Sequence, residues 1–102
     1  MAPARLKVRL LPIAEKDLGE ALTYLTEESP QAAERLADRF EEALGGLAAH
    51  PRLGRVPQDA TLAALGYRFL IVEDYLIFYA LDPGVVVVHR IIHGARDLQR
   101  LL

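Results

Sequence analysis

The chain has 102 residues, of which 52% are hydrophobic and 25% charged, and it contains no cysteine. This suits a single folded domain, residues 1–102, and excludes disulfides, thiolate metal sites and cysteine nucleophiles. The net charge of −2 is unevenly spread, because segment 13–48 carries nine acidic and three basic side chains, which leaves nucleic-acid partners open. No apolar run approaches the roughly 20 residues of a membrane helix, and no signal peptide is recognisable, so we expect a cytoplasmic protein without membrane contact.

The first predicted elements are a strand and a helix. Residues 5–11 alternate basic and apolar side chains, which is the period of a half-buried strand, and Pro12 ends it. From Ile13 to about Glu28 the apolar residues recur at the helical period instead. The predicted apolar face consists of Ala14, Leu18, Ala21, Leu22 and Leu25.

A second helix follows at once. Ser29 and Pro30 are the residue types favoured at a helix N-cap and first turn, and the apolar stripe then continues to about Ala48. Pro51 forbids any continuation of this helix. Because the connection is so short, the two helices should form an antiparallel hairpin.

The second half of the chain is predicted as strands. Residues 50–65 form a loop with a short turn at Ala60–Leu65. Strands are expected at Tyr67–Val72, Tyr75–Leu81 and Val85–Ile92, separated by the tight-turn sequences 73–74 and 82–84. A short helix over Ala95–Leu101 closes the chain. The predicted fold is therefore α+β, in the order β-α-α-β-β-β plus a C-terminal helix. Its helical hairpin packs on one face of a small, mainly antiparallel sheet.

Both faces of this sheet are apolar. By strict alternation, Tyr75, Ile77 and Tyr79 point one way, and Leu76, Phe78 and Ala80 the other. The same rule sets Val86, Val88 and Ile92 against Val85, Val87 and Ile91. A helical hairpin covers only one face, so the other is expected to be a partner surface. The alternative is that loop 50–65 and the C-terminal helix cover it.

Few strand residues carry chemistry. Arg68 and Arg90 on different strands would suit phosphate binding, because guanidinium groups match phosphate oxygens. With His93 or a tyrosine as acid or base, they would cleave RNA through attack of the ribose 2′-hydroxyl. Alternatively, the two arginines pair with Glu73, Asp74 or Asp97.

Metal and cofactor chemistry is not expected. His89 and His93 are four residues apart in an extended segment, roughly 13 Å by strand rise, which is too far for joint ligation. The sequence also has no glycine-rich phosphate loop and no nucleophile elbow. We therefore predict no metal and no cofactor.

Several segments together resemble one family, the RelE/ParE toxin superfamily. The resemblance covers nearly the whole chain in order and rests on these stretches: 14–18 (AEKDL), 24–25 (YL), 29–33 (SPQAA), 47–54 (LAAHPRLG), 66–68 (GYR), 75–79 (YLIFY) and 88–97 (VHRIIHGARD). Each stretch is weak alone, but together they are fairly specific.

The resemblance implies the toxin of a type II toxin–antitoxin pair, neutralised by a cognate antitoxin. We expect the antitoxin to contact the apolar sheet residues Tyr75, Ile77, Tyr79 and Val87. The ParE-like branch poisons DNA gyrase, whereas the RelE-like branch cleaves mRNA on the ribosome with sheet arginines. In this chain, the RelE-like set would be Arg68, Arg90 and His93.

The chain departs from the nuclease pattern in two respects. No tyrosine follows the last strand, and the chain is not basic, whereas proteins that grip ribosomal RNA usually are. We therefore expect a ParE-like toxin. The alternatives are a metal-independent, ribosome-dependent mRNA endoribonuclease and an inactive module that only binds antitoxin.

Overall fold

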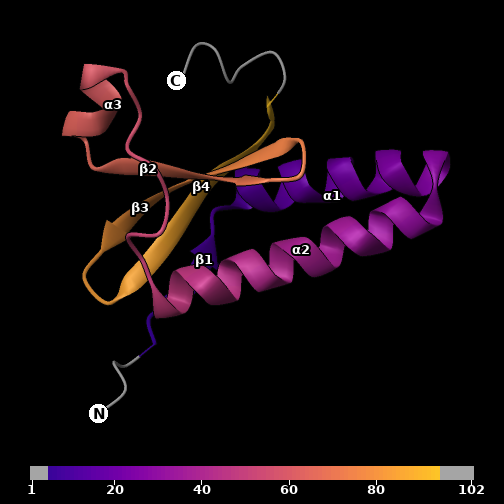
Figure 1. Cartoon of the computed structure of the whole chain (residues 1–102), viewed down its shortest axis with the longest axis horizontal. Helices are drawn as coiled ribbons and strands as arrows, with labels where there is room; N and C mark the ends of the chain where they lie inside the picture. The colour runs from indigo at the N-terminus through magenta and orange to yellow at the C-terminus, as the bar shows by residue number, and fades with distance from the viewer. Residues whose placement is uncertain (1–4, 95–102) are drawn as a thin grey trace.

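The computed structural model describes residues 5–94, and their order is the predicted β-α-α-β-β-β with one additional short helix (Figure 1). The elements are β1 (Lys7–Leu10), α1 (Pro12–Glu28), α2 (Pro30–Ala49), α3 (Ala60–Ala64), β2 (Tyr67–Val72), β3 (Tyr75–Asp82) and β4 (Val85–His93). The predicted C-terminal helix lies outside the described residues. Within them, no helix is long and apolar enough to span a bilayer.

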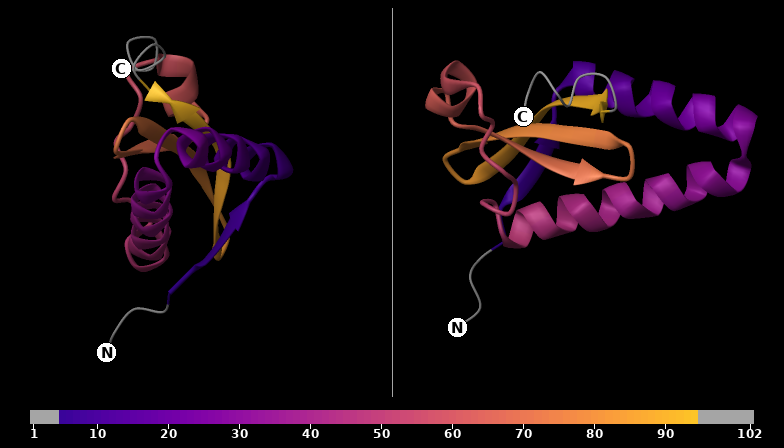
Figure 2. Two further views of the ribbon diagram at one scale, coloured as in Figure 1. Left: turned by 90° about the vertical axis from the view of Figure 1, so that its right-hand side faces the viewer. Right: turned by 45° about the horizontal axis from the view of Figure 1, so that its top comes forward.

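The helical hairpin forms as predicted. Ser29 separates α1 from α2, and its hydroxyl oxygen accepts a hydrogen bond from the backbone N–H of Ala32 at 3.3 Å. Pro12 and Pro30 each occupy the first turn of a helix, where a missing N–H costs nothing. Figures 1 and 2 show the helices joined by a tight turn away from the sheet and diverging towards it.

The sheet has the strand order β1-β4-β3-β2. β1 pairs parallel with β4, whereas β2–β3 and β3–β4 are antiparallel hairpins. Two-residue turns close both hairpins. In the turn between β2 and β3, Glu73 has a φ of 53°. In the turn between β3 and β4, Pro83 is followed by Gly84, whose φ of 76° is the positive value that a type II turn requires. β1 starts later than predicted because the N–H of Leu6 donates to the carbonyl of Ala48 in α2.

A β-bulge corrects the predicted facing of β4. Phe78 pairs with Arg90 but Tyr79 pairs with Val88, so His89 is an extra residue in β4. Beyond it the alternation shifts by one position. Ile91, which is 4% exposed, therefore joins the core beneath the helices, the position that strict alternation gave to Ile92.

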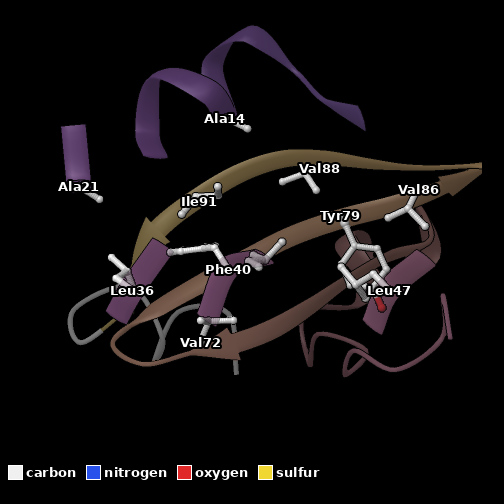
Figure 3. Close-up of a cluster of buried hydrophobic side chains, with 11 residues drawn as sticks. Ala14, Ala21, Leu36, Phe40, Leu47, Val72, Tyr79, Val86, Val88 and Ile91 are labelled. Atoms are coloured by element: carbon white, nitrogen blue, oxygen red, sulfur yellow. The ribbon is translucent and has the colours of Figure 1, made fainter. Parts of the chain in front are cut away.

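The main core lies between the hairpin and one face of the sheet. In Figure 3, side chains from both helices meet those from β2, β3 and β4. The most deeply buried are Ala14 from α1, Leu36, Phe40 and Leu47 from α2, and Ile77, Tyr79, Val86 and Val88 from the sheet. α1 lies over β4 and α2 over β2 and β1, which places the start of α1 beside the second half of β4.

The second face of the sheet is covered in part. Phe69, Leu76 and Phe78 form a smaller buried cluster against which Leu62 of α3 and Tyr67 pack. Arg55 in the preceding loop forms an isolated bridge with Phe69 at the edge of β2. Loop 50–65 therefore contributes cover to this face, as the alternative predicted, and a role of the face as a partner surface stays a prediction.

Candidate functional site

Arg90 of β4 is held by Asp17 of α1. Its Nε donates to Oδ2 of Asp17 at 2.7 Å, and its Nη2 donates to Oδ1 at 3.0 Å. The backbone N–H of Ile91 also donates to Oδ2, at 3.0 Å. Because β1 pairs with β4 only as far as Val88, the Asp17 carboxylate takes the place of a strand partner at the open edge of β4.

Asp17 and Arg90 each favour the charged form of the other. Burial alone would raise the pKa of Asp17, whose side chain is 12% exposed, but the hydrogen bonds from Arg90 and Ile91 and the charge of Arg90 lower it below its ordinary value. The hydrogen bond to Asp17 in turn raises the pKa of Arg90. The pair is therefore a fixed ionic contact between α1 and β4.

Arg68 of β2 is also engaged within the chain. Its Nη1 donates to the carbonyl of Gly54 at 2.9 Å and to that of Arg52 at 3.4 Å. The neighbouring Tyr79 hydroxyl accepts from the N–H of Gly54 at 2.8 Å and donates to the carbonyl of Pro51 at 2.9 Å. Burial raises the pKa of Tyr79, so this hydroxyl keeps its proton and both bonds. Arg68 and Tyr79 together fix loop 51–54.

The three residues predicted for RNA cleavage are only partly brought together. Arg90 and His93 line one hollow, which Arg68 does not reach. Arg90 pairs with Asp17, an acid that the predicted alternative did not name, and Asp97 lies outside the described residues. The two arginines thus bond to different elements and do not present a joint phosphate site.

A hollow lies beside Arg90 and His93. It has a volume of about 460 Å³ between α1 and the end of β4. A second hollow of about 240 Å³ adjoins it and shares the lining residues Tyr24, Tyr75 and His93. The ring of His93 meets that of Tyr75 edge to face, with centroids 5.1 Å apart. We refer to the two hollows together as the tyrosine groove.

The electrostatic environment of the tyrosine groove is negative. Burial, the charge of Asp74 and the nearby Tyr24 all raise the pKa of Tyr75. Glu20 lines the groove from α1, with a side chain that is 69% exposed. The positive charge of Arg90 is already matched by Asp17.

The four predicted antitoxin contacts differ in how far the structure exposes them, and they stay predictions. Ile77 and Tyr79 are fully buried beneath the helices, so a partner docking on the folded domain cannot touch them. Val87 is also buried, at 5% exposure. Tyr75 is half-buried and lines the tyrosine groove, so its role as a contact stays a prediction.

Sequence reasoning missed Asp17 and Tyr24. By its position in the sequence, Asp17 is one of several early acids favoured by the helix dipole. It lies three residues after Ala14 and four before Ala21, at the border of the apolar face, and this position was the available signal for a contact with the sheet. Tyr24 is 61% exposed on α1, and the family resemblance includes it in the stretch 24–25 without assigning it a role.

The architecture is that of a RelE/ParE toxin, and comparison with known proteins establishes the family. The family model described as the ParE toxin of type II toxin–antitoxin system, parDE, matches residues 8–98 of this chain. The chain therefore belongs to the ParE toxin family. It is the toxin of a type II toxin–antitoxin system within the RelE/ParE superfamily.

Individual relatives come from both branches of the superfamily. Toxin RelE2 of Caulobacter vibrioides is 39% identical over 80 residues, which span 78% of this chain and 85% of that protein. A solved structure of the chromosomal ParDE system from P. aeruginosa has a TM-score of 0.72 and 16% identity over 89% of this chain and 98% of its own, a likeness of fold alone. The RelBE2 toxin–antitoxin complex of Mycobacterium tuberculosis has a TM-score of 0.64 and 27% identity over 88% and 92%.

Proposed function

We propose that this toxin is ParE-like and stops growth by binding a protein target such as DNA gyrase, without cleaving RNA itself. The observation that carries this proposal is the engagement of both candidate arginines. Arg90 forms a bidentate pair with Asp17, and Arg68 bonds to the carbonyls of loop 51–54. Freeing either guanidinium for a phosphate would remove a hydrogen-bond partner from the partly buried Asp17 carboxylate or from the carbonyl of Gly54.

We also propose a cognate antitoxin as the partner that restrains the toxin. Two solved relatives of the same fold are described as a ParDE toxin–antitoxin system and a RelBE2 toxin–antitoxin complex. Binding of the antitoxin holds the toxin inactive in the cell. On this proposal, expression of the chain alone arrests growth.

A second function, mRNA cleavage on the ribosome, is favoured by one observation. Arg90 and His93 line the same hollow together with the phenols of Tyr24 and Tyr75, which supplies cation, imidazole and hydroxyl groups in one place. The relative named Toxin RelE2 is compatible with this alternative.

The deciding experiment induces the chain alone in cells and follows mRNA integrity and plasmid supercoiling together as growth stops. We expect intact mRNA and gyrase-linked DNA breaks. Loss of translated mRNA with normal DNA topology would overturn the proposal in favour of the nuclease. Normal growth with folded toxin accumulating would leave only an antitoxin-binding module.

Matched histidine variants sharpen this test. Changing both arginines would remove contacts that hold the fold, so loss of activity in that variant would have two explanations. His93→Gln is cleaner, because the side chain is exposed, and His50→Gln at the end of α2 is its control. A nuclease should lose RNA cleavage with His93→Gln alone, whereas a toxin acting on gyrase should keep its effect on DNA topology in both variants.

A further inference from the structure

The aromatic and acidic side chains that line the tyrosine groove suit the binding of a cationic side chain. Tyr24 from α1 and Tyr75 from β3 line both of its hollows, and His93 stands edge-on to Tyr75. Aromatic rings attract guanidinium and ammonium groups through their negative faces. Tyr24 is 61% exposed, so its ring is accessible to a side chain of a partner.

Charge in the groove favours a cation over an anion. Arg90 is paired with Asp17, and Arg35 shares the carboxylate of Glu73 with Arg39, each at 3.7 Å and between exposed side chains. Two further carboxylates line it, Glu20 in the first hollow and Asp74 in the second. Lys16 lies 3.9 Å from Glu20, but both side chains are exposed, so water screens this pair strongly.

The wider surface agrees with this polarity. The hairpin segment 13–48 carries nine acidic and three basic side chains. A basic segment of a partner would therefore be steered towards α1, and one of its long side chains would then enter the groove.

We infer that the tyrosine groove binds an arginine or lysine side chain of a basic segment in a protein partner. This inference rests on the proposed function for the identity of that partner, the antitoxin. The cation lies between the Tyr24 and Tyr75 rings, and Glu20 and Asp74 supply the compensating charge. Binding would bury Tyr24 against the aliphatic stem of the side chain.

The test uses the full chain and a peptide probe. Isotope-labelled toxin is titrated with acetyl-Ala-Arg-Ala-Ala-Arg-Ala-amide, and with the same peptide in which neutral citrulline replaces arginine. NMR reports the ring signals of Tyr24, Tyr75 and His93. We expect saturable shifts at these rings with the arginine peptide and none with the citrulline peptide.

Substitutions then locate the site. Tyr24→Leu removes the ring but keeps a good helix former, and it should weaken binding by about three- to tenfold, as loss of one cation–π contact predicts. Tyr24→Phe should retain binding. Glu20→Gln should weaken it by about two- to threefold, a typical effect for one exposed charge. Glu41→Gln, on the exposed side of α2 away from the groove, is the matched control and should have no effect.

The outcomes separate this inference from the proposed function, because peptide binding requires neither toxicity nor gyrase. Equal binding of the citrulline peptide, or shifts spread over α2 and insensitive to Tyr24→Leu, would overturn it. Self-association of the toxin without peptide, abolished by Tyr24→Leu, would also overturn it. That result would assign the groove to Arg5, Lys7 or Arg9 of a second copy. Absence of growth arrest would contradict the proposed function alone.

Discussion

At the scale of single residues, the structure gives a physical reason for Gly54, the last residue of the stretch 47–54 that contributes to the family resemblance. A Cβ at this position would lie 2.6 Å from the Tyr79 hydroxyl oxygen and 2.8 Å from the carbonyl oxygen of Phe69. Both atoms belong to buried residues, and the Tyr79 hydroxyl already bonds to the N–H of Gly54 and to Pro51. The glycine is therefore required by the close approach of the loop to the sheet.

Gly54→Ala should lower the free energy of unfolding by about 1–3 kcal/mol, the usual cost of forcing a methyl group into a packed site. Gly19→Ala is the matched control. Gly19 lies in α1, and a Cβ added there would meet nothing within 4 Å, so alanine should stabilise the chain by about 0.5–1 kcal/mol. Urea unfolding of both variants checks the pair. A Gly54→Ala midpoint equal to wild type would show that the loop moves away freely.

At the scale of elements, the sequence predicts most boundaries but not how the elements bond to one another. Local signals suffice where one residue type enforces a geometry: Ser29 and Pro30 start α2, and β2 spans the predicted Tyr67–Val72. The bulge at His89 has no local signal, and a shift of one residue exchanges Ile91 and Ile92 between faces. The sequence predicts the candidate site less well, because Asp17, the partner of Arg90, lies 73 residues away from it in the chain.

The contact between α1 and β4 should make stability depend on acid pH. The pKa of Asp17 is lower in the folded chain than its ordinary value, so the unfolded state binds the proton more tightly. The stabilisation from Asp17 is therefore fully present above the unfolded pKa and is lost as pH falls through the folded pKa. Asp17→Asn should cost about 1–3 kcal/mol at neutral pH, because it leaves Arg90 without its charged partner.

Thermal unfolding measured between neutral and strongly acidic pH checks this prediction. The difference in stability between wild type and Asp17→Asn should shrink as pH falls below about 4, the range in which a free aspartate takes up its proton. Asp38→Asn, at an exposed position of α2, should follow the wild-type curve throughout. A constant difference across the pH range would mean that the Asp17 charge does not stabilise the fold.

At the scale of the whole molecule, the two sheet faces differ in what they leave for a partner. The helices fill one face, and loop 50–65 with α3 covers part of the other. The exposed large apolar side chains of residues 5–94 are Ile13 and Tyr24 on α1, Leu53, Val56 and Leu65 between α2 and β2, and Ile71 and Leu81 on the sheet. We therefore expect a partner of the folded toxin to contact α1, the loop or the β2 edge rather than the buried middle of the sheet.

This arrangement predicts which charged substitutions destabilise the fold and which leave its stability almost unchanged. Ile77→Glu places a carboxylate in the main core, where the native side chain is fully buried, and Val87→Glu does so at a site that is 5% exposed. Each should cost about 3 kcal/mol or more, a large part of the stability of a domain of this size. Ile71→Glu, at 44% exposure on the edge strand, should change stability by only about 0.5 kcal/mol. Circular dichroism and urea unfolding of the three variants measure these changes in stability. If Val87→Glu instead folds normally and loses only partner binding, the middle of the second face is a contact surface, and the partner reaches the sheet there rather than through α1.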